Sequence, residues 1–149
     1  MGRSTHHTSW AASFAVAAEL SRRCYDVTFT VGNAPRYDLL CTGPCKTAFK
    51  VQIKGMSKPG AIWVRSQFFS MPTEEKLFLI AVVVPQTIDD PFRYFILSYQ
   101  QAQEEFKEMP TTKKNGTEIS PDLTGLKGED RLRQRLAVSR HSDGRQSGI

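Results

Sequence analysis

The sequence predicts one α+β domain in which a helix stands at each end of a series of strands. Two observations carry this prediction. An alanine-rich stretch near the N-terminus repeats apolar residues at helical spacing, and the segments after it alternate apolar and polar residues before a helix-capping pattern near residue 98. With 149 residues, of which 40% are hydrophobic, the chain can build one core but not several. We expect the domain to span residues 9–109.

Two helices are predicted. The first runs from Trp10 to Arg23, with Ser9 as its N-terminal cap. The second covers Tyr99 to Glu108, where Ser98 and Gln101 have the spacing of a capping box. The residues of the first helix that recur at helical spacing are Trp10, Phe14, Ala17 and Ser21, and those that raise helix propensity and allow close packing are Ala11, Ala12, Ala15 and Ala18.

Five or six strands are predicted between the helices, and together they form a mixed sheet. Gly32-Asn33 and Thr42-Gly43-Pro44 are turn signals that separate the first three. The nearly continuous apolar run from Leu77 to Val84 predicts a strand covered on both faces. The predicted strands are 25–31, 36–41, 47–54, 61–64, 77–84 and 92–97.

Residues 110–149 are predicted to be a basic and mostly flexible tail. They are rich in Lys, Arg, Ser, Thr and Gly and have no sustained aromatic or β-branched pattern, so they cannot bury enough apolar surface to offset the entropy of ordering. Eight basic and five acidic residues give this segment a net charge of +3, which is more than half of the +5 of the whole chain.

Composition also bounds the partners and the compartment. A net charge of +5 favours a polyanionic partner such as nucleic acid. Three cysteines are too few for a disulfide framework, and the polar N-terminus has no apolar signal core. The longest apolar run, Leu77 to Pro85, is much shorter than the roughly 20 residues of a membrane-spanning helix. We therefore expect a cytoplasmic protein without a membrane segment.

Three polar residues on neighbouring predicted strands form the most informative group. Asp38 lies in the second strand, and Gln52 and Lys54 lie two residues apart in the third, so they project from one face about 7 Å apart. If the two strands pair, a carboxylate, an amide oxygen and an ammonium converge. Oxygen ligands suit Mg²⁺, and a cation can orient water and offset the charge of a phosphodiester transition state.

This arrangement resembles the PD-(D/E)-x-K nuclease superfamily, in particular its small homing-endonuclease-like and Holliday-junction-resolvase-like branch. The residues that carry the resemblance are Arg36-Tyr37-Asp38-Leu39-Leu40, Val51-Gln52-Ile53-Lys54 and the preceding Ala17-Ala18-Glu19-Leu20, and it covers about residues 9–100. The resemblance implies a restriction-endonuclease-like core and a metal-dependent endonuclease that hydrolyses DNA. It implies that Glu19, Asp38 and Gln52 hold Mg²⁺ or Mn²⁺, that Lys54 positions water, and that the protein forms a homodimer.

Gln52 departs from the family pattern, which has Glu or Asp at this position. Glutamine keeps an oxygen ligand but removes one negative charge, which weakens Mg²⁺ binding. One alternative is therefore a catalytically inactive nuclease-fold module that binds nucleic acid. A second is a structural or protein-interaction domain, because the row Lys50, Gln52 and Lys54 is also typical of any half-exposed strand.

Three basic residues are candidates for contacts with nucleic acid: Arg36, Lys58 and Arg65. The segment 58–69 interleaves such cations with aromatic residues, although aromatic residues in this pattern are more often part of a core. The pair Cys41 and Cys45 has neither the spacing of a redox motif nor enough ligands for zinc. The histidines His6, His7 and His141 are interpreted as solvated.

Overall fold

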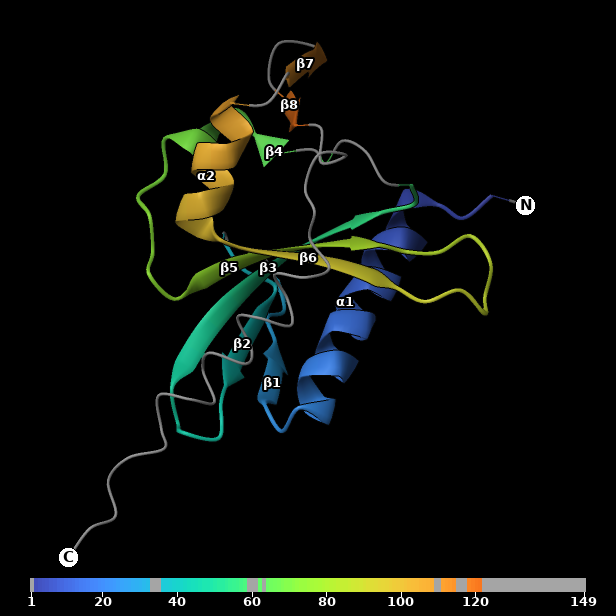
Figure 1. Cartoon of the computed structure of the whole chain (residues 1–149), viewed down its shortest axis with the longest axis vertical. Coiled ribbons are helices and arrows are strands. Elements are labelled where there is room, and N and C mark those ends of the chain that lie inside the picture. The colour runs from blue at the N-terminus through green and yellow to red at the C-terminus, as the bar shows by residue number, and fades with distance from the viewer. Residues whose placement is uncertain are drawn as a thin grey trace, which may run out of the picture.

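The computed structural model describes residues 2–32, 36–58, 62, 64–108, 111–114 and 118–121. Its elements follow the predicted order of helix, strands and helix (Figure 1). They are α1 (Thr5–Arg22), β1 (Asp26–Phe29), β2 (Leu39–Thr42), β3 (Ala48–Met56), β4 (Val64–Arg65), the 3-10 helix Ser66–Phe69, β5 (Leu77–Val83), β6 (Arg93–Ser98), α2 (Tyr99–Glu108), β7 (Thr111–Lys114) and β8 (Glu118–Pro121).

The main sheet has five strands in the order β1-β2-β3-β5-β6. The pair β3 and β5 is parallel, and the other neighbours are antiparallel, so the sheet is mixed as predicted. The chain reaches β5 from β3 through a crossover that holds β4 and the 3-10 helix. This fold class is the one that the sequence predicted.

The sheet separates two hydrophobic clusters, and the helices lie on its opposite faces (Figure 1). Helix α1 packs with Leu39, Val51 and Ile80 on one face. Helix α2 packs with Leu79 and Phe95 on the other. Because β5 contributes alternate residues to both clusters, it is covered on both faces, which its continuous apolar run predicted.

Helix α1 begins at Thr5, five residues before the predicted start at Trp10, because Ser4 rather than Ser9 is the N-cap. The Ser4 hydroxyl accepts a hydrogen bond from the His7 backbone N–H at 3.2 Å. His6 and His7 are therefore helical residues rather than part of a polar leader. The buried residues of the helix also differ from the predicted stripe, and they are Thr8, Ala12, Val16, Ala17 and Leu20.

Helix α2 has the predicted bounds. Its capping box is formed, since the Gln101 N–H donates to the Ser98 hydroxyl at 3.2 Å and the Ser98 N–H donates to the Gln101 side-chain oxygen at 3.1 Å. These two reciprocal hydrogen bonds confirm the predicted capping box.

The region after α2 differs from the expected flexible tail. Strands β7 and β8 pair with each other, and β8 pairs with β4, which gives a second sheet in the order β4-β8-β7. The partner strand β4 is distant in sequence, so local composition did not indicate this pairing. Residues 122–149 of the predicted tail lie outside the described residues.

Within the described helices, none combines the length and apolar character that a membrane span needs.

Candidate functional site

Strand β3 presents different chemistry to the two faces of the sheet. Val51 and Ile53 belong to the cluster under α1, and Met56 belongs to the cluster under α2. Because side chains alternate along a strand, Gln52 and Lys54 point to the same face as Met56. Both are half-buried. The structure therefore places these two residues on one face, as the sequence predicted.

The Asp38 carboxylate lies beside this part of β3. Its Oδ2 atom accepts a hydrogen bond of 2.6 Å from the backbone N–H of Ile53, the residue between Gln52 and Lys54. The Asp38 backbone N–H donates to the Val51 carbonyl at 2.8 Å, just before β2 begins at Leu39. The Asp38 carboxylate thus accepts the hydrogen bond from β3 that a backbone carbonyl would accept if the pairing of β2 with β3 continued. This contact fixes the position of the carboxylate beside the backbone of Ile53.

The Gln52 side chain has a buried oxygen that the rest of the fold does not use. Its Oε1 atom accepts no hydrogen bond from any residue that the structure describes. A buried carbonyl oxygen without a donor costs free energy, about 1–3 kcal/mol, unless a ligand or water satisfies it. Amide and carboxylate oxygens are both ligands that suit a hard divalent cation.

The pair Asp38 and Gln52 contains one carboxylate and one amide. The described residues contain no group of three or more His, Cys, Asp or Glu side chains arranged to hold a metal ion. Mg²⁺ commonly takes one or two protein carboxylates and completes its shell with water and substrate phosphates. The residues therefore fit a weakly held ion that the substrate helps to bind better than a tightly bound structural ion.

The structure does not bring Glu19 to this group. Glu19 lies on α1, the helix on the opposite face of the sheet, near the end of the helix. Its two carboxylate oxygens accept hydrogen bonds from Arg22 and Arg23, with Arg22 Nη1 at 3.0 Å and Arg23 Nε at 2.9 Å. The spacing within α1 produces these local ion pairs, and the sequence pattern could not show which face of the sheet the helix covers.

A second polar contact lies on β3 two residues before Gln52. The Lys50 ammonium bonds to Glu74 at 2.6 Å and lies 5.1 Å from the centre of the Tyr37 ring. The hydrogen bond to Glu74 raises the pKa of Lys50 above its usual value. Lys50 is thus engaged by the segment before β5.

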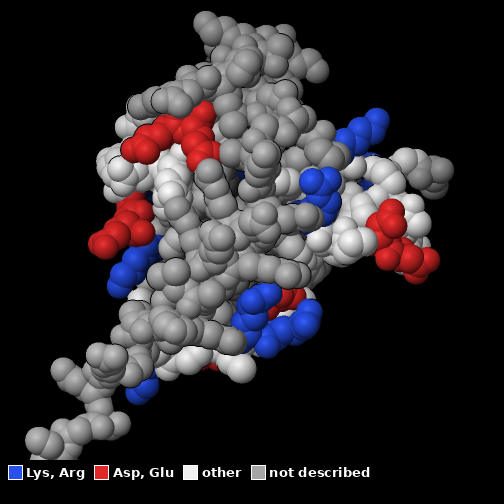
Figure 2. Space-filling view, in the orientation of Figure 1, with Lys and Arg blue, Asp and Glu red and all other residues white. Residues whose placement is uncertain are grey.

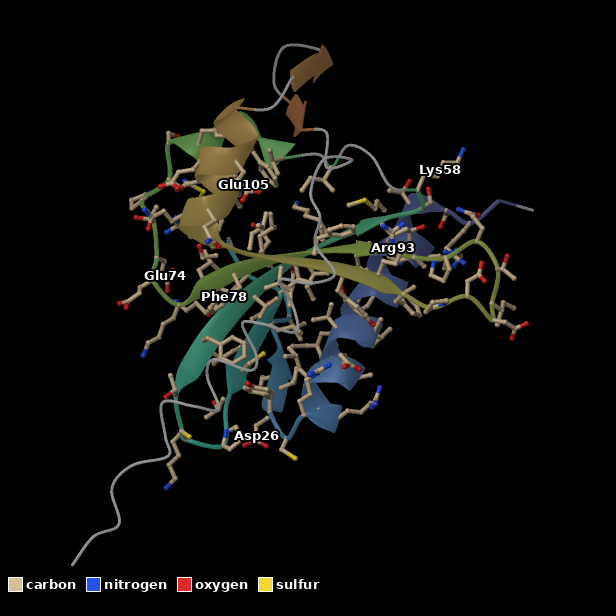
Figure 3. The ribbon with its side chains drawn as sticks, viewed as in Figure 1. Asp26, Lys58, Glu74, Phe78, Arg93 and Glu105 are labelled. Atoms are coloured by element: carbon tan, nitrogen blue, oxygen red, sulfur yellow. The ribbon has the colours of Figure 1, made fainter. Side chains whose placement is uncertain are left out.

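The three basic residues expected to contact nucleic acid have different environments. Arg36 is half-buried, donates to the Pro72 carbonyl at 2.8 Å and lies over the Tyr99 ring. Lys58 is exposed just after β3 and extends into solvent (Figure 3). The side chain of Arg65 lies outside the described residues, although its backbone is part of β4. In the view of Figure 2, the Lys and Arg side chains of the described residues stand in separate groups.

Sequence reasoning gave no role to Glu105, an acidic residue on α2. It follows the buried Ala102 by three residues and precedes the buried Phe106, so it lies at the margin of the helix face that packs on the sheet (Figure 3). Its Oε2 atom is buried. The only local signal was its position beside the apolar stripe of an amphipathic helix. The face of the sheet it would meet was not predictable.

The aromatic residues of segment 58–69 that the structure describes are part of the core. Phe68 is buried and packs against Phe106 and Tyr99, and Phe69 packs at the edge of the same cluster. Trp63 lies outside the described residues. The interpretation of these rings as core residues rather than base-stacking residues is therefore confirmed for Phe68 and Phe69.

The two helices and the five-stranded mixed sheet define the α+β fold of this chain. Two solved structures share it. One is the bacterial homing endonuclease I-Ssp6803I, with 17% sequence identity, a TM-score of 0.51 and coverage of 95% of this chain and 99% of the other. The second is a nuclease from a fusselovirus, with 16% identity, a TM-score of 0.55 and coverage of 96% and 98%. Neither a family model nor a curated protein matches this sequence.

Proposed function

We propose that this protein is a metal-dependent endonuclease that hydrolyses DNA phosphodiester bonds. The observation that carries the proposal is the hydrogen bond of 2.6 Å from the backbone N–H of Ile53 to the Asp38 carboxylate. Ile53 is the residue between Gln52 and Lys54, and two nucleases share the fold. The net charge of +5 supports a polyanionic substrate.

Each residue of the group has a role in this proposal. Asp38 and Gln52 supply oxygen ligands to Mg²⁺ or Mn²⁺, and the bound ion offsets negative charge on the phosphate. The Lys54 ammonium orients the attacking water and stabilises charge on the phosphoryl oxygens as the P–O bond breaks. Lys58 and Arg65 contact neighbouring phosphates, and so does Arg36, whose guanidinium is held by a hydrogen bond to the Pro72 carbonyl. A homodimer that acts on both strands is part of the proposal.

The test compares cleavage of plasmid and branched DNA by wild type, Asp38→Asn and Lys54→Met in Mg²⁺ or Mn²⁺. We expect both variants to lose at least about 100-fold in rate, because each removes a charge that acts on the transition state. Glu19→Gln is the matched control for the carboxylate, and Lys46→Met, in the turn between β2 and β3, is the control for the ammonium. Equal rates in all five proteins would reject the site.

A binding measurement separates the ligand roles from activity. Mn²⁺ titration followed by calorimetry should show weaker binding in Asp38→Asn and tighter binding in Gln52→Glu, because the second variant adds the carboxylate that the family pattern contains. Asn retains an acceptor for the Ile53 N–H, so Asp38→Asn should remain folded. Unchanged Mn²⁺ binding in both variants would remove Asp38 and Gln52 from the proposed ligand set.

The second candidate function is a catalytically inactive module that binds nucleic acid. Gln52 favours it, because its amide carries no charge at the position where the family pattern has Glu or Asp. This function predicts DNA binding that weakens steeply with salt, persists in EDTA and produces no cleavage. Restoration of cleavage by Gln52→Glu alone would show that the fold is competent and that this one residue decides between the two functions.

A further inference from the structure

The outward face of α1 is unusually apolar for a helix at the surface. Between Thr8 and Ala18 the helix has no charged residue. On its inward side Ala12, Val16 and Ala17 are buried, yet on its outward side Trp10 is 48% exposed and Phe14 is 56% exposed. Helices that are apolar on all sides are generally buried on all sides. The sheet covers α1 on one side, and among the described residues no other helix or strand packs on its outward side.

Three exposed rings and one half-buried ring form a continuous row, which we call the aromatic strip: His6, Trp10, Phe14 and the half-buried Phe29. Trp10 and Phe14 are stacked with centroids 5.3 Å apart, and Phe14 meets Phe29 edge to face at 5.6 Å. His6 contacts Trp10 at 6.2 Å. Since Phe29 lies in β1, the strip leads from α1 onto the edge strand of the main sheet.

Strand β1 adds hydrogen-bonding groups to this surface. Among the described strands it pairs only with β2, so its outer backbone groups face away from the sheet. An edge strand next to exposed aromatic rings offers both directional bonds and apolar area to another chain. Exposed edges of this kind are the places where sheets extend between molecules.

The charge of this surface favours a second copy of the chain over DNA as its partner. The charged side chains at this edge are Glu19, Arg22, Arg23 and Asp26, and their charges cancel, although the chain as a whole has a net charge of +5. Two copies of a basic protein repel least where their surfaces are neutral. This surface offers DNA few available cations, because Arg22 and Arg23 are already paired with Glu19. In a twofold contact the same surface of both copies meets reciprocally, so the aromatic strip of one copy can pack on the aromatic strip of the other.

We propose that a second copy of this chain docks on the aromatic strip and along the outer edge of β1, so that a twofold dimer extends the sheet across β1. This proposal does not rest on nuclease activity, because neither the strip nor β1 includes the site on the other face of the sheet. It assigns the assembly surface that the sequence did not identify.

The test measures the molar mass of the full chain over a range of concentrations by sedimentation equilibrium. Wild type should reach twice 16.8 kDa, and Phe14→Glu should dissociate at least about 30-fold more readily, as expected when a charge replaces a central aromatic residue. Ile88→Glu is the control, since this residue is 94% exposed and lies in the loop between β5 and β6. It should associate like wild type. A monomeric wild type, or equal association of Phe14→Glu, would overturn the proposal.

A second measurement locates the contact. Backbone amide exchange at residues 26–29 should slow as the wild-type concentration rises and should stay fast in Phe14→Glu. Circular dichroism establishes that the variant is folded, which we expect because Phe14 is more than half exposed. If amide exchange in β1 is independent of concentration, or if Phe14→Glu weakens DNA binding while wild type is a monomer, the strip contacts nucleic acid and the dimer proposal fails.

Discussion

The two faces of strand β3 perform different tasks, although their residues alternate along a single segment. The face toward α1 consists of apolar side chains such as Val51 and Ile53 and contributes to stability through packing. The opposite face holds Gln52 and Lys54, whose polar groups gain little from burial. The comparison teaches that, in a small domain, one strand can combine a core and a site because its period of two residues separates them.

The largest expected effect tests the packed face. Leu39 is fully buried under α1, directly after Asp38, and Leu39→Ala should lower the free energy of unfolding by about 2–5 kcal/mol because it leaves a cavity. Leu40, the next residue, is 38% exposed, and Leu40→Ala should cost less than about 1 kcal/mol. Urea denaturation measures both. Equal losses of unfolding free energy in Leu39→Ala and Leu40→Ala would contradict the division of the sheet into a packed face toward α1 and an opposite face.

The packed face should also make stability depend on pH. Burial raises the pKa of the Cys41 thiol from 9.0 to about 11. As the pH rises above 9, the thiol ionises in the unfolded chain but stays protonated in the folded one, so stability falls between about pH 9 and 11. The expected contribution is roughly 2–3 kcal/mol.

The control for this pH dependence is Cys41→Ala, measured by urea denaturation at several pH values under reducing conditions. Burial also raises the pKa of Tyr94 and of Tyr99, so some decline remains in both proteins. The difference between wild type and variant isolates the thiol. If that difference is constant from pH 8 to 11, the thiol is not shielded from solvent in the folded protein.

A smaller effect comes from the close approach of α1 to β3. A Cβ atom at Gly55 would lie 2.8 Å from the Thr8 carbonyl oxygen and 2.9 Å from the Ala12 Cβ, so Gly55→Ala must displace the helix. We expect a loss of about 1–3 kcal/mol. Thermal denaturation measures it, and an unchanged melting temperature would show that α1 moves away from the sheet at no cost.

The smallest expected effect concerns Glu19. Its ion pairs with Arg22 and Arg23 are close to solvent, so Glu19→Gln should change the free energy of unfolding by less than about 1 kcal/mol. Its DNA cleavage should equal that of wild type, since the residue lies on the other side of the sheet from Gln52. A large loss of cleavage with unchanged stability would show that Glu19 reaches the site after all.

Local patterns in the sequence determined much of the fold. The alternation in β3, the apolar run of β5 and the capping box of α2 each depend on residues a few positions apart, so periodicity and capping chemistry were sufficient to predict them. The same alternation placed Gln52 and Lys54 on one face. The predicted start of α1 at Trp10 was wrong, because Ser4 and not Ser9 caps the helix.

Only the tertiary structure decided which layers meet. It placed α1 and Glu19 on the opposite face of the sheet from Gln52, turned Trp10 and Phe14 outward, and paired β8 with the distant strand β4. It also brought the Asp38 carboxylate to the Ile53 N–H across fifteen residues of sequence. Contacts within a helix or strand follow from its own period, whereas the choice between two faces of a sheet depends on the packing of the whole chain, which no local pattern encodes.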